Sequence, residues 1–134
     1  MSDADDLKSV PAAGVKEASK AMLQMQLYAI FTTPTDGLGA VFANLEEHLK
    51  FQVELERKGI MFAAGPMWTD DEQSWEGEGL VVIRAASREA AIEIARADPM
   101  HRSGARNFKV RPWMINEGSL TLRFDFSTQA FGMS

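Results

Sequence analysis

The 134-residue sequence predicts an α+β fold, a ferredoxin-like split β-α-β domain whose antiparallel sheet carries both helices on one face. Two observations lead to this prediction. The spacing of apolar residues switches between the period of two that strands show and the period of about 3.6 that helices show. The segments defined in this way follow one another in the order β-α-β-β-α-β, and a further strand comes after them.

Each strand is predicted from its own pattern. Residues 24–31 place apolar side chains at every odd position, and residues 107–114 and 120–126 alternate in the same manner. Residues 60–64 and 79–85 are short apolar runs of the kind that is buried on both faces. The predicted sheet therefore has four strands, and the strand at 120–126 is additional to it.

Two segments have the helical period. In residues 38–58 an apolar stripe recurs every three or four positions, and Gly59 ends the helix. The members of that stripe are Leu38, Phe42, Leu45, Leu49 and Val53. The second helix begins after Ser87, whose hydroxyl can cap it, and ends at Pro99.

Composition divides the chain into three parts. Residues 1–20 alternate charged and small side chains, which predicts a mobile tail with a helical turn at 15–21. Residues 21–115 hold the predicted domain, including an acidic, solvated loop between its second and third strands. Residues 116–134 form an extension that contains the additional strand.

Charge and motif content exclude several classes of protein. The net charge of −5 disfavours nucleic acid, and no apolar stretch approaches the roughly 20 residues of a membrane helix. The acidic start is unlike a secretory signal, and cysteine is absent. No histidine spacing or glycine-rich loop matches a metal or phosphate site. We expect a cytoplasmic protein without cofactor or metal, which binds neither nucleic acid nor membrane.

One face of the predicted sheet is left uncovered by the two helices. Residues 60–64 and 79–85 are apolar on both faces, and Tyr28 and Trp113 are expected to project from the uncovered one. An exposed apolar face of this size is typical of an interface, so the sequence favours a homodimer with two sheets packed face to face. The alternative is that the strand at 119–127 or the tail folds over its own sheet.

Two histidines and one aspartate are the candidates for chemistry. His48 lies on the flank of the apolar stripe of the first helix, next to both core and solvent. Asp98 continues the buried stripe of the second helix at its C-terminal end, where the helix dipole disfavours a carboxylate. If these two flanks face each other, His48 and Asp98 form a proton-transfer pair, with His101 as a second candidate partner.

Each candidate also has a plainer interpretation. His48 can be a surface or structural histidine, Asp98 a turn former before proline, and His101 an exposed loop residue. The single basic cluster either binds a small carboxylate or phosphate ligand or balances the acidic loop. Its members are Arg102, Arg106, Lys109 and Arg111.

A set of short motifs adds a resemblance. In chain order they are His48-Leu49, Gly59, Ala64-Gly65-Pro66, Asp98-Pro99, Gly104 and Val110-Arg111-Pro112-Trp113. Their order and spacing resemble the YCII-related domain family, from the first strand through Trp113. The resemblance implies a ferredoxin-like fold that dimerises as an α/β barrel, similar to muconolactone isomerases. It also implies a His–Asp site at His48 and Asp98, with Gly65 and Pro66 near the same pocket.

The resemblance also bears on activity. A related enzyme type eliminates chloride from a hydroxylated aromatic, which implies proton transfer on a small ring without a cofactor. Family members often carry a basic residue three positions before the histidine, where this chain has Leu45. The first 20 residues and the segment from Asn116 to Ser134 extend beyond the compact family domain.

The sequence thus leads to a first functional hypothesis and two alternatives. The first is a small dimeric lyase- or isomerase-like enzyme in which His48 is the general base or acid and Asp98 orients it. Tyr28, Met67 and Trp113 would then form an apolar wall, and His101 or Arg111 would meet a polar substituent. The alternatives are a non-catalytic dimeric protein that binds a small ligand or serves as an accessory in the same cavity, and a purely structural protein.

Overall fold

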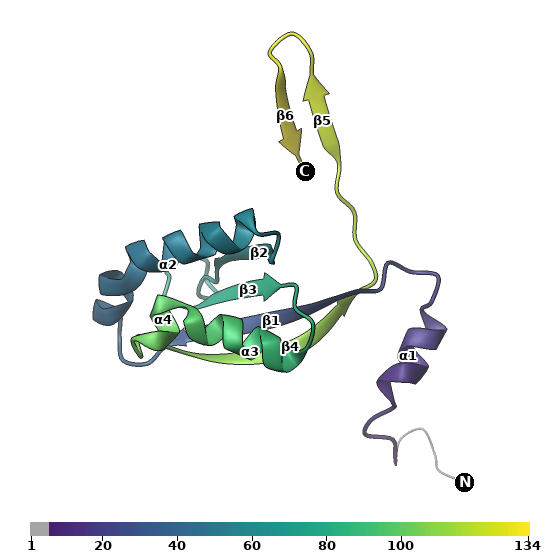
Figure 1. Ribbon diagram of the computed structural model, residues 1–134, viewed down its shortest axis with the longest axis horizontal. Coiled ribbons are helices and arrows are strands. Elements are labelled where there is room, and N and C mark those ends of the chain that lie inside the picture. Colours follow the sequence, from purple (N-terminus) through teal and green to yellow (C-terminus); the bar gives the residue numbers. More distant parts are fainter. Residues whose placement is uncertain (1–5) are drawn as a thin grey trace. The chain divides into compact units, whose positions relative to one another are not determined.

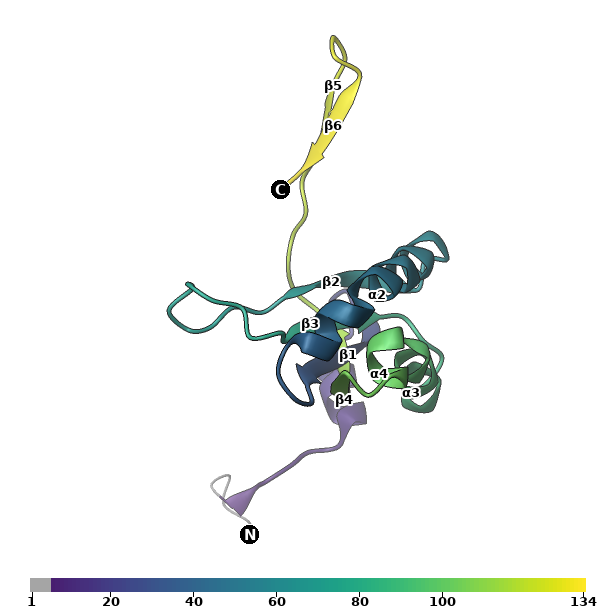
Figure 2. The same cartoon turned by 90° about the vertical axis from the view of Figure 1, so that its left-hand side faces the viewer.

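The computed structural model describes residues 6–134 and contains the predicted four-stranded antiparallel sheet (Figure 1). Its strands are connected in the order β-α-β-β-α-β, and they lie in the spatial order β2-β3-β1-β4. The elements that build the sheet and its helices are β1 (Met25–Pro34), α2 (Gly39–Arg57), β2 (Met61–Pro66), β3 (Gly79–Ile83), α3 (Arg88–Ala97) and β4 (Arg106–Ile115). Figure 2 shows α2 and α3 on the same side of the sheet, so the predicted ferredoxin-like α+β fold is confirmed.

The register of the central strands decides which side chains share a face. Strand β3 pairs antiparallel with both β1 and β2, and Val81 stands opposite Ile30 on one side and Ala64 on the other. Because side chains alternate along a strand, Tyr28, Ile30 and Thr32 lie on one face of β1. A register shift between Met61 and Ala63 interrupts the pairing of β2.

The core lies between the sheet and helix α3. Its buried cluster comprises Tyr28, Ile30, Val81, Ile83, Ala91, Ala95 and Val110. Since Ala91 and Ala95 belong to α3, the even-numbered residues of β1 face the helices. The expectation that Tyr28 projects from the uncovered face is therefore wrong. The apolar body of its ring is buried against the helix, and the side chain is only 8% exposed.

The opposite face of the sheet is partly exposed. Phe31 and Trp113 are 39% and 46% exposed, whereas Leu27, Ala29 and Val82 on that face are buried. Trp113 lies on this face because Val110, on the same strand, points into the core, and neighbouring positions alternate. The expected position of Trp113 thus agrees with the structure.

Helix α2 buries a different side from the one that its apolar stripe predicts. Its buried residues are Val41, His48 and Leu55, whereas Phe42 and Val53 of the predicted stripe are more than half exposed. His48 consequently lies in the centre of the buried side rather than on its flank. Helix α2 packs on β2 and on α4 (Pro99–Arg102), a single turn that follows α3.

Pro99 follows the end of α3 and is also the first residue of the extra turn α4. The backbone of Asp98 is extended, and its side chain accepts a hydrogen bond from the backbone N–H of Met100 at 2.9 Å. Proline is favoured at the first helical position because it has no N–H to leave unpaired. Asp98 therefore caps α4, and this function fixes the position of its carboxylate.

The N-terminus of α3 provides a stability prediction. The Ser87 hydroxyl accepts a hydrogen bond from the Ala90 N–H at 3.1 Å, as its sequence position predicts. We expect Ser87→Ala to lower the free energy of unfolding by about 1 kcal/mol, since a free N–H of the first turn loses its partner. Urea denaturation measures the change. Ser87→Asn supplies an equivalent acceptor and should leave stability nearly unaltered; equal loss in both variants would contradict the capping explanation.

The described residues 6–25 and 115–134 form a second compact unit. Helix α1 (Ala12–Ala18) begins three residues before the predicted turn, directly after Pro11. Strand β5 (Leu122–Asp125) pairs antiparallel with β6 (Ala130–Met133), and Phe124 stands opposite Phe131. The sequence predicts only the first of these two strands, because residues 130–133 (Ala-Phe-Gly-Met) do not alternate apolar and polar side chains.

Within the described residues, no helix has the length and apolar character needed to cross a membrane.

Candidate active site

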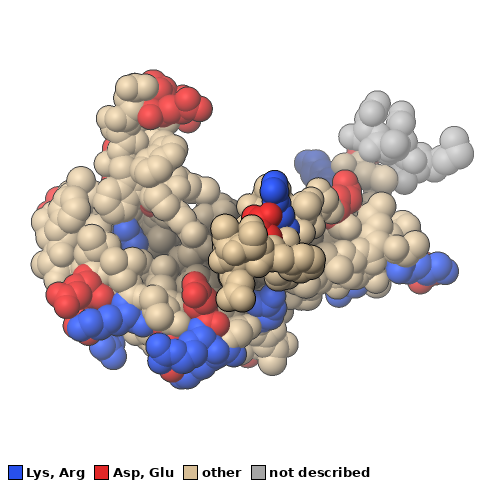
Figure 3. Space-filling model, turned by 90° about the horizontal axis from the view of Figure 1, so that it is seen from above, with Lys and Arg blue, Asp and Glu red and all other residues tan. Residues whose placement is uncertain are grey.

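A pocket of about 400 Å³ lies between helix α2 and the ends of the central strands. It is lined by Thr32, Leu45, His48, Leu49, Gln52, Ala64, Gly65, Pro66, Trp68, Trp75, Glu78, Gly79, Leu80, Val81 and Arg106. Figure 3 shows a hollow in the surface that is walled mainly by uncharged residues and has basic atoms in its depth. The pocket has the size and apolar walls that are typical of small-molecule sites.

His48 and Asp98 meet at the inner wall of this pocket. Nδ1 of His48 lies 2.9 Å from Oδ1 and 2.8 Å from Oδ2 of Asp98, and the two residues are 7% and 4% exposed. Helix α2 positions the histidine, and the junction of α3 and α4 positions the aspartate. The structure therefore brings together two side chains that are 50 positions apart in the chain.

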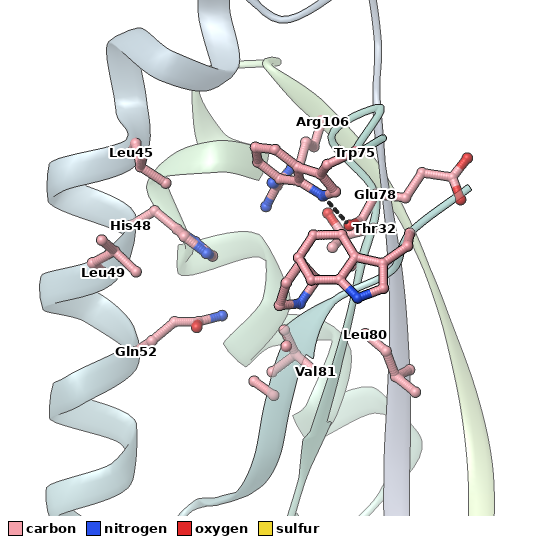
Figure 4. Close-up of a pocket in the computed structure, with 15 residues that line it drawn as sticks. Thr32, Leu45, His48, Leu49, Gln52, Trp75, Glu78, Leu80, Val81 and Arg106 are labelled. Atoms are coloured by element: carbon pink, nitrogen blue, oxygen red, sulfur yellow. Dashed lines mark hydrogen bonds between the residues drawn. The ribbon is translucent and has the colours of Figure 1, made fainter. Parts of the chain in front are cut away.

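The hydrogen bonds determine the tautomer of His48. A carboxylate can only accept, so Nδ1 carries the hydrogen and donates it to Asp98. In the neutral ring, Nε2 is then the atom with the free lone pair. Figure 4 shows the His48 ring extending from α2 into the pocket, and no hydrogen bond to Nε2 is found among residues 6–134. The pair thus presents an oriented base to the cavity.

His101 lies behind the pocket rather than in it. Its Nδ1 donates to the carbonyl oxygen of Ala95 at 2.7 Å, and its Nε2 lies 2.8 Å from the hydroxyl of Thr32. The ring also contacts Phe108, with the two ring centroids 4.5 Å apart. Thr32 lines the pocket, whereas His101 does not. His101 therefore holds the Thr32 side chain and α4 in place.

Burial lowers the pKa of His101 below its ordinary value of 6.5 and outweighs the Ala95 carbonyl and the Asp98 charge, which act to raise it. The unfolded chain then binds this proton more tightly than the folded chain does. The stability that neutral His101 contributes to the fold is complete above pH 6.5. It is lost as the pH falls through that value toward the lower pKa of the folded state.

We therefore expect His101→Gln to weaken the pH dependence of stability. Glutamine can still donate and accept, but it does not titrate. Urea denaturation at pH values above and below 6.5 measures how much stability the wild type and the variant each lose on acidification. The wild type should lose more stability on acidification than the variant, and parallel losses would contradict the assignment.

The other predicted ligand-binding residues divide into two groups. Gly65 and Pro66, at the end of β2, line the pocket. Tyr28 belongs to the core, while Arg111 and Trp113 are exposed on the opposite face of the sheet, and none of the three lines the pocket. For Arg111 and Trp113 the alternation of β4 is the reason, because its odd-numbered residues point away from the helices. Met67 lies beside the pocket, at the start of the acidic loop, and is not part of its lining.

Arg106 and Trp75 are two of the pocket residues that are not among the sites predicted from the sequence. Arg106 had been considered only as a member of the basic cluster, and Trp75 lies in the acidic loop. Arg106 is 5% exposed, and its guanidinium carbon lies 5.9 Å from the centroid of the Trp75 ring. Burial lowers the pKa of Arg106, partly opposed by the charge of Asp98. Arg106 shares its strand face with Phe108 and Val110, so the alternation of β4 is the signal that identifies it.

Between residues 6 and 134, no three His, Cys, Asp or Glu side chains come close enough to hold an ion.

The fold and the pocket together define a class: a small ferredoxin-like α+β domain with a buried His–Asp pair in a pocket of small-molecule size. The YCII-related domain matches residues 26–114 of the sequence. The chain therefore belongs to the YCII-related domain family, as its motifs suggest.

Comparison with solved structures supports the same fold. The chain is similar to the 5-chloro-2-hydroxyhydroquinone dehydrochlorinase of Burkholderia phenoliruptrix AC1100, solved in complex with 2,5-dihydroxybenzoquinone. The two share 19% sequence identity, the match covers 65% of this chain and 92% of that chain, and the TM-score is 0.53. No match is found among curated proteins.

Proposed function

We propose that this protein is a cofactor-independent enzyme of the lyase or isomerase type, which moves a proton on a small ring substrate. The observation that carries the proposal is the buried His48–Asp98 pair, whose Nδ1 is bound to the carboxylate at 2.8 Å while the ring lines the pocket. A base oriented in this way is the arrangement that general acid–base catalysis requires.

The proposed reaction needs only His48 and Asp98 from this chain. A C–H or O–H bond of the substrate breaks, and its proton goes to Nε2 of His48. In an elimination, the electron pair that remains forms a new π bond while a leaving group departs with the electrons of its own bond. In an isomerisation, the proton returns from Nε2 to another ring atom. The Asp98 carboxylate, 2.8 Å from Nδ1, stabilises the imidazolium in between.

The shape of the pocket favours a flat substrate. The aromatic side chains Trp68 and Trp75 and the aliphatic side chains Leu45 and Val81 contribute to its walls. The Trp75 ring is held by a hydrogen bond from its Nε1 to the carbonyl oxygen of Glu78 at 2.7 Å, drawn as the dashed line in Figure 4. The dehydrochlorinase with the similar fold is described with a quinone ligand, which supports a ring compound as the substrate.

A substrate screen tests the proposal. The purified protein is incubated in D₂O with chlorinated and unchlorinated hydroquinones and hydroxyquinones. Halide release reports elimination, and incorporation of deuterium on carbon reports isomerisation. We expect turnover of at least one member of the panel above the rate without protein. Ligands that bind, as seen by quenching of tryptophan fluorescence, but are never converted would contradict the enzyme hypothesis and favour the non-catalytic binding protein.

We also propose that the protein is a homodimer, formed through the sheet face opposite the helices. Exposed Phe31 and Trp113 on that face support it. In the second compact unit, the hairpin of β5 and β6 also has exposed apolar side chains, since Phe124 and Phe131 are 66% and 72% exposed. A two-stranded hairpin is marginally stable by itself in water, and large exposed apolar patches are typical of interfaces.

Sedimentation velocity at micromolar concentration tests the dimer. The wild type should sediment as a dimer, and Trp113→Asp should shift it to the monomer because a carboxylate would be buried at the interface. Val53→Asp, at a similarly exposed apolar position of α2, is the matched control and should remain dimeric. A monomeric wild type would refute the dimer, and a dimeric Trp113→Asp would refute the assigned face.

A further inference from the structure

One polar group in the pocket has no described partner. Arg106 is 5% exposed, and its Nε atom is buried without a hydrogen bond. Among the described residues, the ion pairs do not include Arg106. Arginine is rarely buried unless it is paired, because it remains charged in proteins and desolvation of an unpaired charge is costly.

The nearby carboxylates do not pair with Arg106. Asp98 already accepts hydrogen bonds from His48 and from the Met100 N–H. Glu78 lines the pocket, but its side chain is exposed, and Figure 4 shows its carboxylate turned away from Arg106. The indole of Trp75 lies against the guanidinium and supplies a cation–π contact, which does not satisfy the N–H groups.

We propose that Arg106 binds an anionic oxygen of the pocket's ligand, so that the protein selects flat ring compounds that carry a carboxylate or a ring oxyanion. Arg106 comes from β4 and His48 from α2, and both line the same cavity. Figure 4 shows the nitrogen atoms of both side chains directed into the space beside Trp75. A ligand anchored on the guanidinium would therefore place its ring beside the indole and present another edge to Nε2 of His48.

This inference rests on the pocket of the proposed function and specifies its substrate class. The guanidinium offers several N–H donors in a fixed planar fork, which matches the two oxygens of a carboxylate. A charge-assisted hydrogen bond that has no counterpart in a neutral ligand corresponds to a preference of about tenfold or more.

Benzoate and benzamide are the probes that isolate the charge, because they have nearly the same shape. Their affinities are measured by quenching of tryptophan fluorescence, and 2,5-dihydroxybenzoquinone represents the ring oxyanions. We expect benzoate to bind the wild type about tenfold or more tighter than benzamide. If the quinone alone binds tightly, the natural anion is a ring oxyanion; if benzoate alone does, it is a carboxylate.

Three variants complete the experiment. Arg106→Gln should bind benzoate no better than benzamide. Arg102→Gln, which removes the same charge from an exposed position on α4, should keep the wild-type preference. His48→Gln should also keep the preference, so loss of turnover in that variant is distinguishable from loss of anion binding.

The wild type provides a second test that does not depend on the folding of any variant. At a given concentration, a ligand that binds the folded state more tightly raises the thermal midpoint of unfolding further. Benzoate should raise this midpoint, and the same concentration of benzamide should raise it less. Equal affinities of the wild type for both probes, with 2,5-dihydroxybenzoquinone bound no more tightly than benzamide, would overturn the proposal. So would a charge preference that survives Arg106→Gln.

Discussion

His48→Gln is expected to reduce kcat by about 10²–10⁴-fold on any ring compound that the screen identifies. Glutamine fills a similar volume and can donate its amide hydrogen to Asp98, so the fold should be retained. It has no basic nitrogen at the position of Nε2, so it cannot take the substrate's proton. Steady-state kinetics give kcat, and circular dichroism with urea denaturation verifies the fold.

The control for this variant lies on the same helix. Glu47→Gln changes an exposed residue next to His48 and should leave kcat unchanged. Turnover within threefold of wild type in His48→Gln would exclude His48 as the general base. The proton acceptor would then have to be another pocket residue or water.

Asp98→Ala is expected to have the largest effect on stability. The carboxylate accepts hydrogen bonds from His48 and from the Met100 N–H, and both donors lose their partner in this variant. A hydrogen bond to a charged group contributes roughly 1.5–3 kcal/mol and a helix cap about 1 kcal/mol, so the free energy of unfolding should fall by about 3 kcal/mol. Urea denaturation measures this change.

Asp98→Asn separates stability from proton transfer. The amide oxygen can still cap α4, so this variant should be clearly more stable than Asp98→Ala. Its NH₂ group faces Nδ1 of His48 and favours the other tautomer, with the proton on Nε2, so kcat should fall by orders of magnitude. Full activity in Asp98→Asn would mean that the carboxylate does not orient the base, and equal stability of the two variants would refute the cap.

Much of the fold can be predicted from periodicity alone. The alternation in 24–31 and the helical period in 38–58 belong to local segments, and their order along the chain defines the split β-α-β arrangement. His48 and Asp98 were also identifiable, since each interrupts an otherwise apolar or electrostatically favourable pattern. The family match over residues 26–114 agrees with these motifs.

Which side of α2 and of β1 faces the core could not be predicted in the same way. The stripe containing Phe42 and Val53 is the more apolar side of α2, yet the helix buries His48, which finds a hydrogen-bond partner in Asp98. On β1, the side that faces the helices contains Tyr28, whereas the more apolar odd positions lie on the opposite face of the sheet. Hydrophobicity describes which side chains favour burial, but packing against neighbouring elements decides which of two apolar faces is chosen.

The sequence by itself determined the order of the main strands and helices, and it singled out His48 and Asp98 as candidates for a pair. Tertiary structure decided the membership of the pocket: it includes Gly65, Pro66 and Arg106, and leaves out Arg111. The physical reason is that strand alternation assigns side chains to opposite faces, while register and helix position settle which face meets the cavity. Arg106 is an example, because a basic residue in a cluster becomes a buried, unpartnered cation only when β4 lies in the sheet.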